Sequence, residues 1–390
     1  MVRVDRGRKA MLVVSAALVG FVLLGGVIGR SLAVEGTYSF LKLFNEVLYL
    51  VRNNYVEQVK EDTLMQGAYR GMLEALDPQS EYLSAEAAQR AVKNTRNGPA
   101  EIGVVLSKRQ KYAVIVSALE GSPAQKAGLG TGDLLLTIDG KSTLWMGAWQ
   151  ATQALQGKPG TEVRLTVLRS TEPRSEEIKV VRKLPLKSPL STSLPEPGTG
   201  LLRLGSVQAG DAERVRKALS TLKSQGAARL LLDLRSNAGS NVDEAVRIAG
   251  LLGGEGTVAK LEQKKEGTTE LKAPGSPAAY QGSLALLVDA GTAGAAEVLA
   301  VALKERNGAT LVGEKTWGLG TVQKVITLPT GDGIRLSVGK YVSPSGKEWN
   351  GTGISPDVIQ QRGSSAGGED LQLRKGLEIL SRENEQHKAA

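Results

Sequence analysis

The stretch GEKTWGLGTVQ, residues 313–323, has the outline of a catalytic loop. Gly318 and Gly320 suit a tight turn, and a strand pattern follows them. The residue held between the two glycines is Leu319, whose aliphatic side chain can neither accept nor donate a proton. The loop therefore has the form of a catalytic element without a group that can do chemistry.

Composition excludes several kinds of catalytic site. The chain has no cysteine and one histidine, His387, which lies in a polar stretch near its end. A Ser-His-Asp triad, a Cys-His pair and a His-based zinc site each need an imidazole at a folded site. Asp233 and Asp289 end two predicted strands and raise the alternative of paired carboxylates or a metal site, but helix capping and pairing with Arg235 are the favoured roles. We expect no metal and no cofactor.

The net charge of +9 does not indicate a nucleic-acid partner. Aromatic residues make up 4% of the chain, so platforms on which bases could stack are scarce. After the N-terminal region there is no dense run of Lys and Arg. The basic charge suits an ordinary solvated surface, or one that faces anionic lipid or cell-envelope polymers.

The N-terminal region predicts membrane targeting. Residues 10–29 are uncharged and about long enough to span a bilayer as a helix. The basic flank that precedes them stays on the cytoplasmic side, so the rest of the chain should be exported. It comprises Arg3, Arg6, Arg8 and Lys9. Ser31 and Ala33 have the spacing of a signal-peptidase site. Residues 1–33 are therefore either a retained anchor in the inner membrane, with the rest of the protein facing the periplasm or the extracellular side, or a signal peptide that is cleaved after Ala33, which would release a secreted protein.

The remaining patterns predict a mixed α/β fold in several parts. Residues 36–97 read as helical, with apolar positions at three-to-four spacing and a break at Pro78. Short strands around one helix at 148–155 follow, and then strands and helices alternate, as in an α/β layer with partly parallel strands. The predicted parts after the helical one are a β-rich module at 98–183, a Pro/Ser/Gly-rich linker at 184–200, an α/β core at 201–362 and a helical tail at 363–390.

The β-rich module resembles a PDZ domain. GSPAQKAGLGTGDLLLTIDGKS, residues 121–142, matches the stretch around the short helix of that family, and AEIGVV, residues 100–105, falls at its carboxylate-binding loop. The resemblance implies that backbone N–H groups bind a chain-terminal carboxylate while the adjoining strand edge pairs with the peptide. The implied peptide-binding residues are Ala100, Glu101, Ile102, Gly103 and Val104. The alternative is a PDZ domain that acts as a spacer or lid.

Four further motifs resemble the carboxyl-terminal processing peptidases, family S41, which combine a PDZ domain with a Ser-Lys dyad. They occur in the family's order, with the PDZ-like module between the first and the second. The motifs are LDPQSEYLS, LLLDLRSNAGSNVDEAV, GTAGAAEVLAVALKERNGATLVGEKTWGLGTVQ and YVSPSGKEWNGTGISPDV. The resemblance covers residues 38 to about 360.

The resemblance assigns the dyad to positions where this chain has no reactive side chain. Aligned without gaps on Glu297, the family's serine falls at Gly294 and its lysine at Leu319. The glutamine that orients the lysine is kept as Gln323. Three substitutes are disfavoured because each is expected to face away from the site: Lys315, Thr292 and Lys324.

The oxyanion site implied by the family is altered as well. One donor is the backbone N–H at position 294, which Gly294 can still supply at a helix start. The second comes from a loop that here reads Asn237-Ala238-Gly239-Ser240, so that Gly239 is kept and Ser240 replaces a second glycine. We therefore expect a groove that can still hold a carbonyl or carboxylate group but contains no nucleophile.

These observations predict an exported or membrane-anchored pseudopeptidase. Its expected partners are protein C-termini bound through the PDZ domain, the membrane through residues 10–29, and a second copy or an active peptidase. One alternative is an active serine endopeptidase that uses substitutes such as Ser240 or Lys315. Another is a membrane-associated structural protein with an inert PDZ domain.

Overall fold

The computed structural model describes residues 38–94, 98–171, 174–187, 189–275, 278–363 and 368–389. The chain divides into two compact units, Met1–Tyr69 and Arg70–Ala390. In the first unit, residues 38–54 are helical and α2 (Glu61–Glu74) begins. The apolar stretch 10–29, its basic flank and Ala33 lie outside the described residues. Within the described ranges, no helix has the length and apolar character needed to cross a bilayer.

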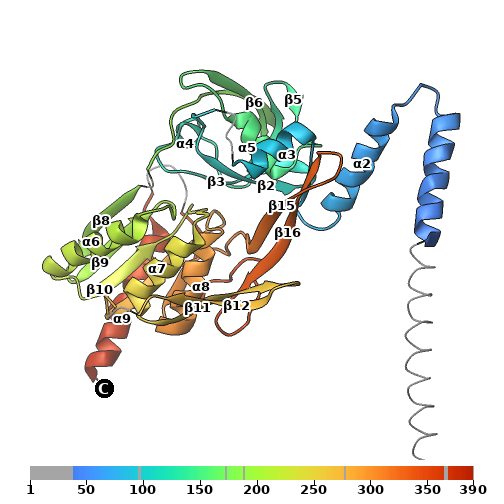
Figure 1. Cartoon of the computed structure of the whole chain (residues 1–390). Coiled ribbons are helices and arrows are strands. Elements are labelled where there is room, and N and C mark those ends of the chain that lie inside the picture. Colours follow the sequence, from blue (N-terminus) through green and yellow to red (C-terminus); the bar gives the residue numbers. More distant parts are fainter. Residues whose placement is uncertain are drawn as a thin grey trace, which may run out of the picture. The chain divides into compact units, whose positions relative to one another are not determined.

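The α/β core of the second unit is built on a six-stranded sheet (Figure 1). Its order is β17-β14-β13-β10-β9-β8, and all neighbours are parallel except the antiparallel pair β8–β9. The partly parallel layer predicted from the sequence is therefore confirmed. The strands are β8 (Leu190–Glu196), β9 (Thr199–Leu204), β10 (Arg229–Asp233), β13 (Ser283–Val288), β14 (Thr310–Gly313) and β17 (Val358–Ile359).

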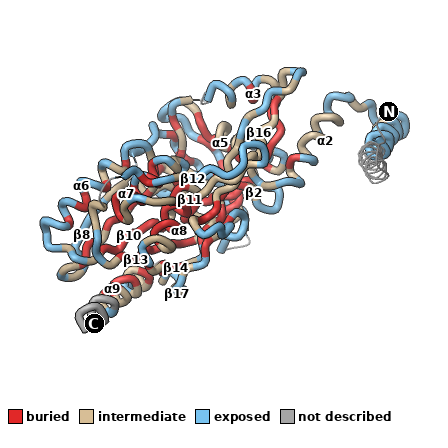
Figure 2. The backbone as a smooth tube through the Cα atoms, turned by 60° about the horizontal axis from the view of Figure 1, so that its bottom comes forward, coloured by how far each residue is buried: buried red, intermediate tan, exposed pale blue. Residues whose placement is uncertain are grey.

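Helices cover both faces of this sheet. Leu230 and Leu232 pack in one apolar cluster with α6, α7 and α8, whereas Leu231 packs in another with α9. Successive residues of a strand point to opposite faces, which explains why β10 reads as a continuous apolar run. The buried backbone runs through β10, β13 and α8 (Figure 2). The helices are α6 (Asp211–Ser224), α7 (Val242–Gly253), α8 (Ala295–Asn307) and α9 (Leu371–Ala389).

Two predictions about local structure were wrong. The expected linker 184–200 contains β8, a mostly exposed edge strand whose pairing with β9 shifts register near Pro195. Proline is tolerated at an edge or a bulge, so its presence did not exclude a strand. The expected helical part contains β1 (Glu81–Leu83) before α3 (Ala85–Val92), because this short segment pairs antiparallel with residues 333–335 far along the chain.

β1 belongs to a second sheet that carries Gln323. The order is β1-β16-β11-β12, and β15 pairs with β16. The other strands are β11 (Gly256–Gln263), β12 (Gly267–Ala273), β15 (Thr321–Thr327) and β16 (Gly333–Val342).

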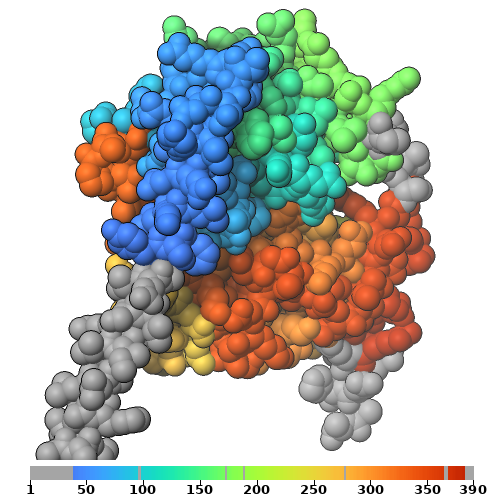
Figure 3. Space-filling model, turned by 90° about the vertical axis from the view of Figure 1, so that its right-hand side faces the viewer, coloured from blue at the N-terminus to red at the C-terminus, as the bar shows by residue number. Residues whose placement is uncertain are grey.

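The PDZ domain forms a third sheet, in the order β2-β3-β4-β6-β7, with β5 paired to β4. The predicted helix at 148–155 is confirmed as α5, whereas the mostly exposed β7 was not predicted. Figure 3 shows the teal and green PDZ surface against the orange surface of the core, and Ser117 Oγ of the domain donates to the carbonyl of Ser236 at 2.5 Å. The elements are β2 (Val104–Arg109), β3 (Tyr112–Ala118), α4 (Pro123–Lys126), β4 (Leu134–Ile138), β5 (Lys141–Ser142), α5 (Ala148–Leu155), β6 (Glu162–Leu168) and β7 (Ser175–Val181).

Candidate active site

Gly294 is the N-cap of α8, at a strand-to-helix turn. Its φ of 62° and ψ of −121° define a conformation that L-residues with side chains rarely adopt. Some hydrolases expose a nucleophilic serine on a similarly strained turn. Here the space beside it is taken, because a Cβ at position 294 would lie 2.6 Å from the carbonyl oxygen of Gly239. The strained turn is retained without room for a side chain.

Leu319 lies in the loop between β14 and β15. Gly318 has a φ of 96°, and a Cβ there would lie 2.7 Å from the backbone nitrogen of Gly353, so the glycine before Leu319 is required by close packing. The N–H of Trp317 donates to the carbonyl of Thr292 at 3.0 Å, which ties the loop to the turn before α8. This hydrogen bond joins the loop that carries Leu319 to the turn that carries Gly294.

A cavity of about 260 Å³ brings the predicted site residues together. Gly239, Ser240, Gly294, Leu319 and Gln323 all line it. The rest of its lining is mainly apolar or uncharged: Gln79, Val105, Ala238, Val242, Ala295, Thr321, Val322 and Tyr341. No Lys, Arg, His, Asp or Glu is among these lining residues, and Tyr341, whose pKa is raised by burial, supplies the phenol in this lining.

The amide of Gln323 is held by neighbouring polar groups. Its Nε2 donates to Thr321 Oγ1 at 2.7 Å and to Ser337 Oγ at 3.3 Å, and its Oε1 accepts from Arg335 at 3.2 Å. The retained glutamine is thus ordered although position 319 offers no amine for it to orient.

The predicted oxyanion donors are engaged within the protein, which corrects the expectation that they are free. The N–H of Gly294 donates to Glu297 Oε2 at 3.0 Å, and that of Gly239 donates to Asn237 Oδ1 at 3.1 Å. The carbonyl of Gly239 accepts from Ala295 N at 2.7 Å and so faces the helix start. Ser240 is exposed at the edge of the cavity. The direction in which each backbone N–H points decides whether it is free to bind a ligand, and the residue types alone do not reveal that direction.

Glu297 organises the site and was not recognised as a functional residue from the sequence. Its carboxylate is fully buried and accepts from Thr316 Oγ1, from Gly318 N at 2.7 Å and from Leu319 N at 2.8 Å, besides Gly294 N. Burial raises the pKa of Glu297 to about 7, against the opposite effect of these four donors. The available sequence signal was a glutamate at the third position of a helix, the capping-box spacing.

The disfavoured substitutes do not enter the cavity. Lys315 and Lys324 are exposed. Lys324 lies on β15 next to Gln323, and neighbouring residues of a strand point to opposite sides. Thr292 is buried, and its hydroxyl donates to the carbonyl of Leu234 at 2.8 Å while accepting from Asp289 N at 3.0 Å. None of the three lines the cavity.

The predicted peptide-binding loop borders a second cavity, of about 480 Å³. Glu101, Gly103 and Val104 line it, whereas Ala100 and Ile102 are buried in the domain. Gly103 has a φ of 78°, and a Cβ there would lie 2.5 Å from Ser122 Cβ, so this loop needs a glycine. We call this cavity the groove. Thr152 of α5 and Gln156, just after that helix, line it, and the core contributes Val207, Gln208 and Ala209 among others.

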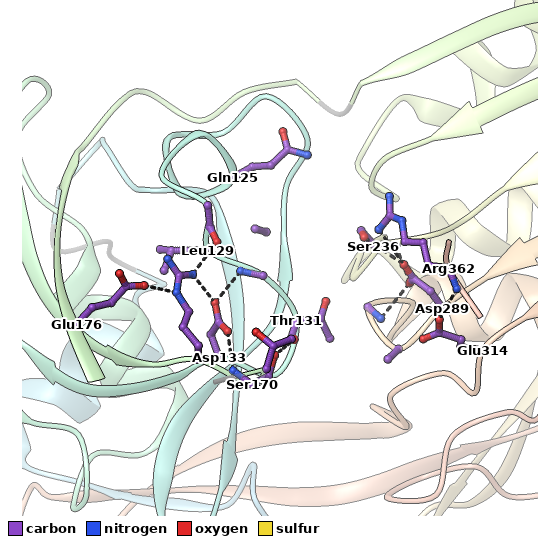
Figure 4. A pocket seen from close by; sticks show the side chains of 17 residues that line it. Gln125, Leu129, Thr131, Asp133, Ser170, Glu176, Ser236, Asp289, Glu314 and Arg362 are labelled. Atoms are coloured by element: carbon purple, nitrogen blue, oxygen red, sulfur yellow. Dashed lines mark hydrogen bonds and ion pairs between the residues drawn. The ribbon is translucent and has the colours of Figure 1, made fainter. Parts of the chain in front are cut away.

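A third cavity, of about 850 Å³, contains none of the predicted dyad, oxyanion or peptide-binding residues. It lies between the PDZ domain and the core, and its charged groups are already paired, for example Arg169 with Asp133 at 2.9 Å (Figure 4). Asp289, on the core side, accepts from Ser236 N and Gly291 N at 2.8 and 2.9 Å.

Asp233 has the ordinary role that the sequence favoured. It pairs with Arg235 at 2.7 Å, and Arg203 donates to it at 2.8 Å. Asp289 holds the turn that leads to α8. Among the described residues, no group of three or more His, Cys, Asp or Glu is placed to hold a metal ion.

Comparisons with known proteins agree with this architecture. The profile of peptidase family S41 matches residues 198–360, that of the PDZ domain residues 114–169, and that of the activating protease CtpB N-terminal domain residues 30–87. A carboxyl-terminal-processing protease of Synechocystis is 32% identical over 348 residues, which are 85% of this chain and 81% of that protein. The carboxy-terminal processing protease CtpA of Bacillus subtilis is 29% identical over 89% of this chain and 74% of that protein.

A solved structure shows the same fold. The photosystem II D1 C-terminal processing protease superposes with a TM-score of 0.68 at 27% identity, over 80% of this chain and 86% of that one. Fold, motifs and identity together define a PDZ-containing member of peptidase family S41. The chain belongs to the carboxyl-terminal processing protease family.

Proposed function

We propose that this protein is a non-hydrolysing member of its family that binds the C-termini of other proteins in the cell envelope. The observation that carries the proposal is the lining of the cavity at Gly294 and Leu319. The position of the nucleophile has no side chain, the position of the base has an aliphatic one, and the lining includes no Lys, His, Asp or Glu; burial raises the pKa of Tyr341, which makes its phenolate a poor substitute. Covalent catalysis needs a nucleophile and an adjacent base that activates it. Without a hydroxyl at position 294 and an amine at position 319, the covalent mechanism of the family is not possible.

The PDZ groove supplies the binding function. Gly103 leaves backbone close to the site of a peptide carboxylate, and β2 and α5 form the two walls of the groove. Residues 10–29 would anchor or export the protein. A second copy or an active peptidase is the further partner consistent with this role.

One observation favours the rival function, an active serine endopeptidase with relocated residues. Ser240 is exposed and lines both the cavity and the groove, so a bound peptide would pass beside its hydroxyl. It lacks a base in the cavity, and Lys315 points to solvent. We therefore rank this function second.

Hydrolysis and peptide binding by the purified full-length protein test the proposal. We expect no labelling by a serine-directed fluorophosphonate and no digestion of an unstructured test protein. Short fluorescein-labelled peptides ending in Ala, Val, Leu or Phe should bind with a free carboxylate and roughly tenfold or more weakly as amides, because hydrogen bonds to a charged group are lost.

Two results would decide against it. Labelling and digestion that disappear in Ser240→Ala would establish the rival function. Equal affinity for the acid and amide forms of every peptide would show that the groove does not recognise a C-terminal carboxylate.

A further inference from the structure

The segment 77–83, within the motif LDPQSEYLS, is not explained by the chemistry of the cavity. Asp77 accepts from Gln79 N at 2.7 Å and from Ser80 N at 2.9 Å, which fixes a tight turn before β1. Beyond that turn, the side chain of Glu81 leaves the core and reaches the PDZ domain.

Glu81 caps α5 from outside the domain. The N-cap residue of α5 is Gly147, which has no side chain to accept a hydrogen bond. The carboxylate of Glu81 accepts instead, from Trp149 N at 3.0 Å and from Gln150 N at 3.3 Å. The amide of Gln150 in turn donates to the carbonyl of Tyr82 at 2.7 Å. The first turn of this helix is therefore held by β1.

Close packing shows that the contact is built into both partners. A Cβ at position 147 would lie 1.9 Å from Glu81 Oε2, so a glycine is needed for the carboxylate to reach the helix end. Glu81 is 5% exposed, and a buried carboxylate at a helix N-terminus is stabilised by the two N–H donors and the helix dipole.

The capped helix forms one wall of the groove. Thr152, in the second turn of α5, and Gln156, just after the helix, line the groove opposite Gly103 and Val104. The position of α5 therefore sets the width of the groove. We propose that Glu81 is a positioning residue for the groove, supplied by the core, and that it raises the affinity for C-terminal peptides. This inference rests on the proposed PDZ function.

The electrostatic surroundings give the inference a distinctive pH dependence. Burial raises the pKa of Glu81 above its ordinary value of 4.5, while Arg335 and more weakly Lys108 act in the opposite direction. Arg335 lies 3.7 Å away on β16, and Lys108 on β2 is itself paired with Glu74 at 2.6 Å. Asp77 also faces Arg335. Protonation of Glu81 weakens the cap, so peptide affinity should fall as the pH falls through this raised pKa.

The test compares Glu81→Gln with the wild type, both as full chains. The matched control is Glu86→Gln, because Glu86 on α3 is highly exposed and pairs only along its own helix, with Arg90. The probe is the tightest-binding free-carboxylate peptide of the fluorescein-labelled panel. At pH 8 we expect Glu81→Gln to bind it roughly three- to tenfold more weakly, as for loss of an N-cap, and the control to be unchanged.

Two readouts separate positioning from general destabilisation. The affinities of wild type and Glu81→Gln should converge as the pH is lowered through the raised pKa of Glu81, since the variant has no carboxyl group to titrate. Amide hydrogen exchange at Trp149 and Gln150 should be faster in the variant, with the exchange of β3 unchanged. If Glu81→Gln does not fold, Gln150→Ala replaces it, with about a twofold loss of affinity expected for a single lost hydrogen bond.

The outcomes are distinguishable from those of the proposed function. If the wild type binds peptides and the Glu81→Gln variant has the same affinity and the same pH profile, the role of Glu81 is overturned and the PDZ function stands. The absence of binding by the wild type to every free-carboxylate peptide overturns the proposed function and this inference with it.

Discussion

The cavity at Gly294 and the groove beside Gly103 belong to the same unit but depend on different atoms. Hydrolysis in the cavity would require particular side chains at positions 294 and 319, and neither is present. The groove requires a glycine loop and a helix wall, both of which are present. A function carried by side chains depends on the residue types at a few positions, whereas one carried by backbone depends mainly on local conformation.

The backbone groups around the cavity are engaged in hydrogen bonds within the protein. Glu297 occupies the N–H of Gly294 and holds Leu319, and the carbonyl of Gly239 fills the adjoining space. The two regions still share Arg335, which lies 3.7 Å from Glu81 and donates to Gln323 at 3.2 Å. The two cavities also share lining residues, among them Val105, Ala238 and Ser240.

The largest effect is expected for Glu297→Ala. The change removes the acceptor of four donors in a buried site and leaves a cavity, so the free energy of unfolding should fall by about 4 kcal/mol. Urea denaturation followed by far-UV circular dichroism measures it. Glu266→Ala, on the exposed turn between β11 and β12, is the matched control and should change it little. The affinity of the folded variant for peptides should be unchanged. A decrease in the free energy of unfolding of less than about 1 kcal/mol would contradict the organising role of Glu297.

The architecture could be predicted better from the sequence than the state of the site. Continuous apolar strands such as β10 and the capped helix α8 have strong local patterns, and the resemblance placed Gly294, Leu319 and Gln323 together. β1 could not be predicted, because a three-residue strand is stabilised by pairing with β16 rather than by its own pattern.

The direction of individual backbone groups was equally beyond prediction. Whether the N–H of Gly239 faces the cavity or Asn237 depends on a local hydrogen bond within the loop and on contact with Ala295. The carboxylate of Glu297 accepts from its own helix start and from residues 316–319, which only the folded chain brings beside it. Residue types identify which groups are available, and tertiary contacts decide which of them are used.

A smaller effect should appear in the pH dependence of stability. Burial raises the pKa of Glu297 from 4.5 to about 7. A carboxyl group with a higher pKa in the folded protein binds more protons when folded, so its contribution is complete below pH 4.5 and is lost as the pH rises through 7. The difference in unfolding free energy between wild type and Glu297→Gln should change by up to about 3 kcal/mol over this window.

Denaturation at closely spaced pH values measures this difference. Subtracting the Glu297→Gln curve removes the contributions of carboxyl groups that behave in the opposite way, such as Asp370, whose pKa is lowered by its bond with Arg235. A difference that stays constant from pH 4.5 to 8 would show that the four donors outweigh burial and that Glu297 is ionised throughout.

The smallest effect is expected for Gly294→Ser, which restores a hydroxyl at the position of the nucleophile. Its cost should be about 2 to 3 kcal/mol, from the strained backbone and the contact with the carbonyl of Gly239. Gly308→Ser is the matched control, because Gly308 has a similar φ of 64° but open space around a Cβ, and about 1 kcal/mol is expected there. The excess at position 294 combines the greater backbone strain of its ψ of −121°, against 22° at Gly308, with the contact against the carbonyl of Gly239. Equal costs would mean that neither the backbone nor the 237–239 loop excludes a side chain at position 294. Hydrolysis should remain absent in Gly294→Ser and in its combination with Leu319→Lys, since the N–H groups of Gly294 and Gly239 are both engaged.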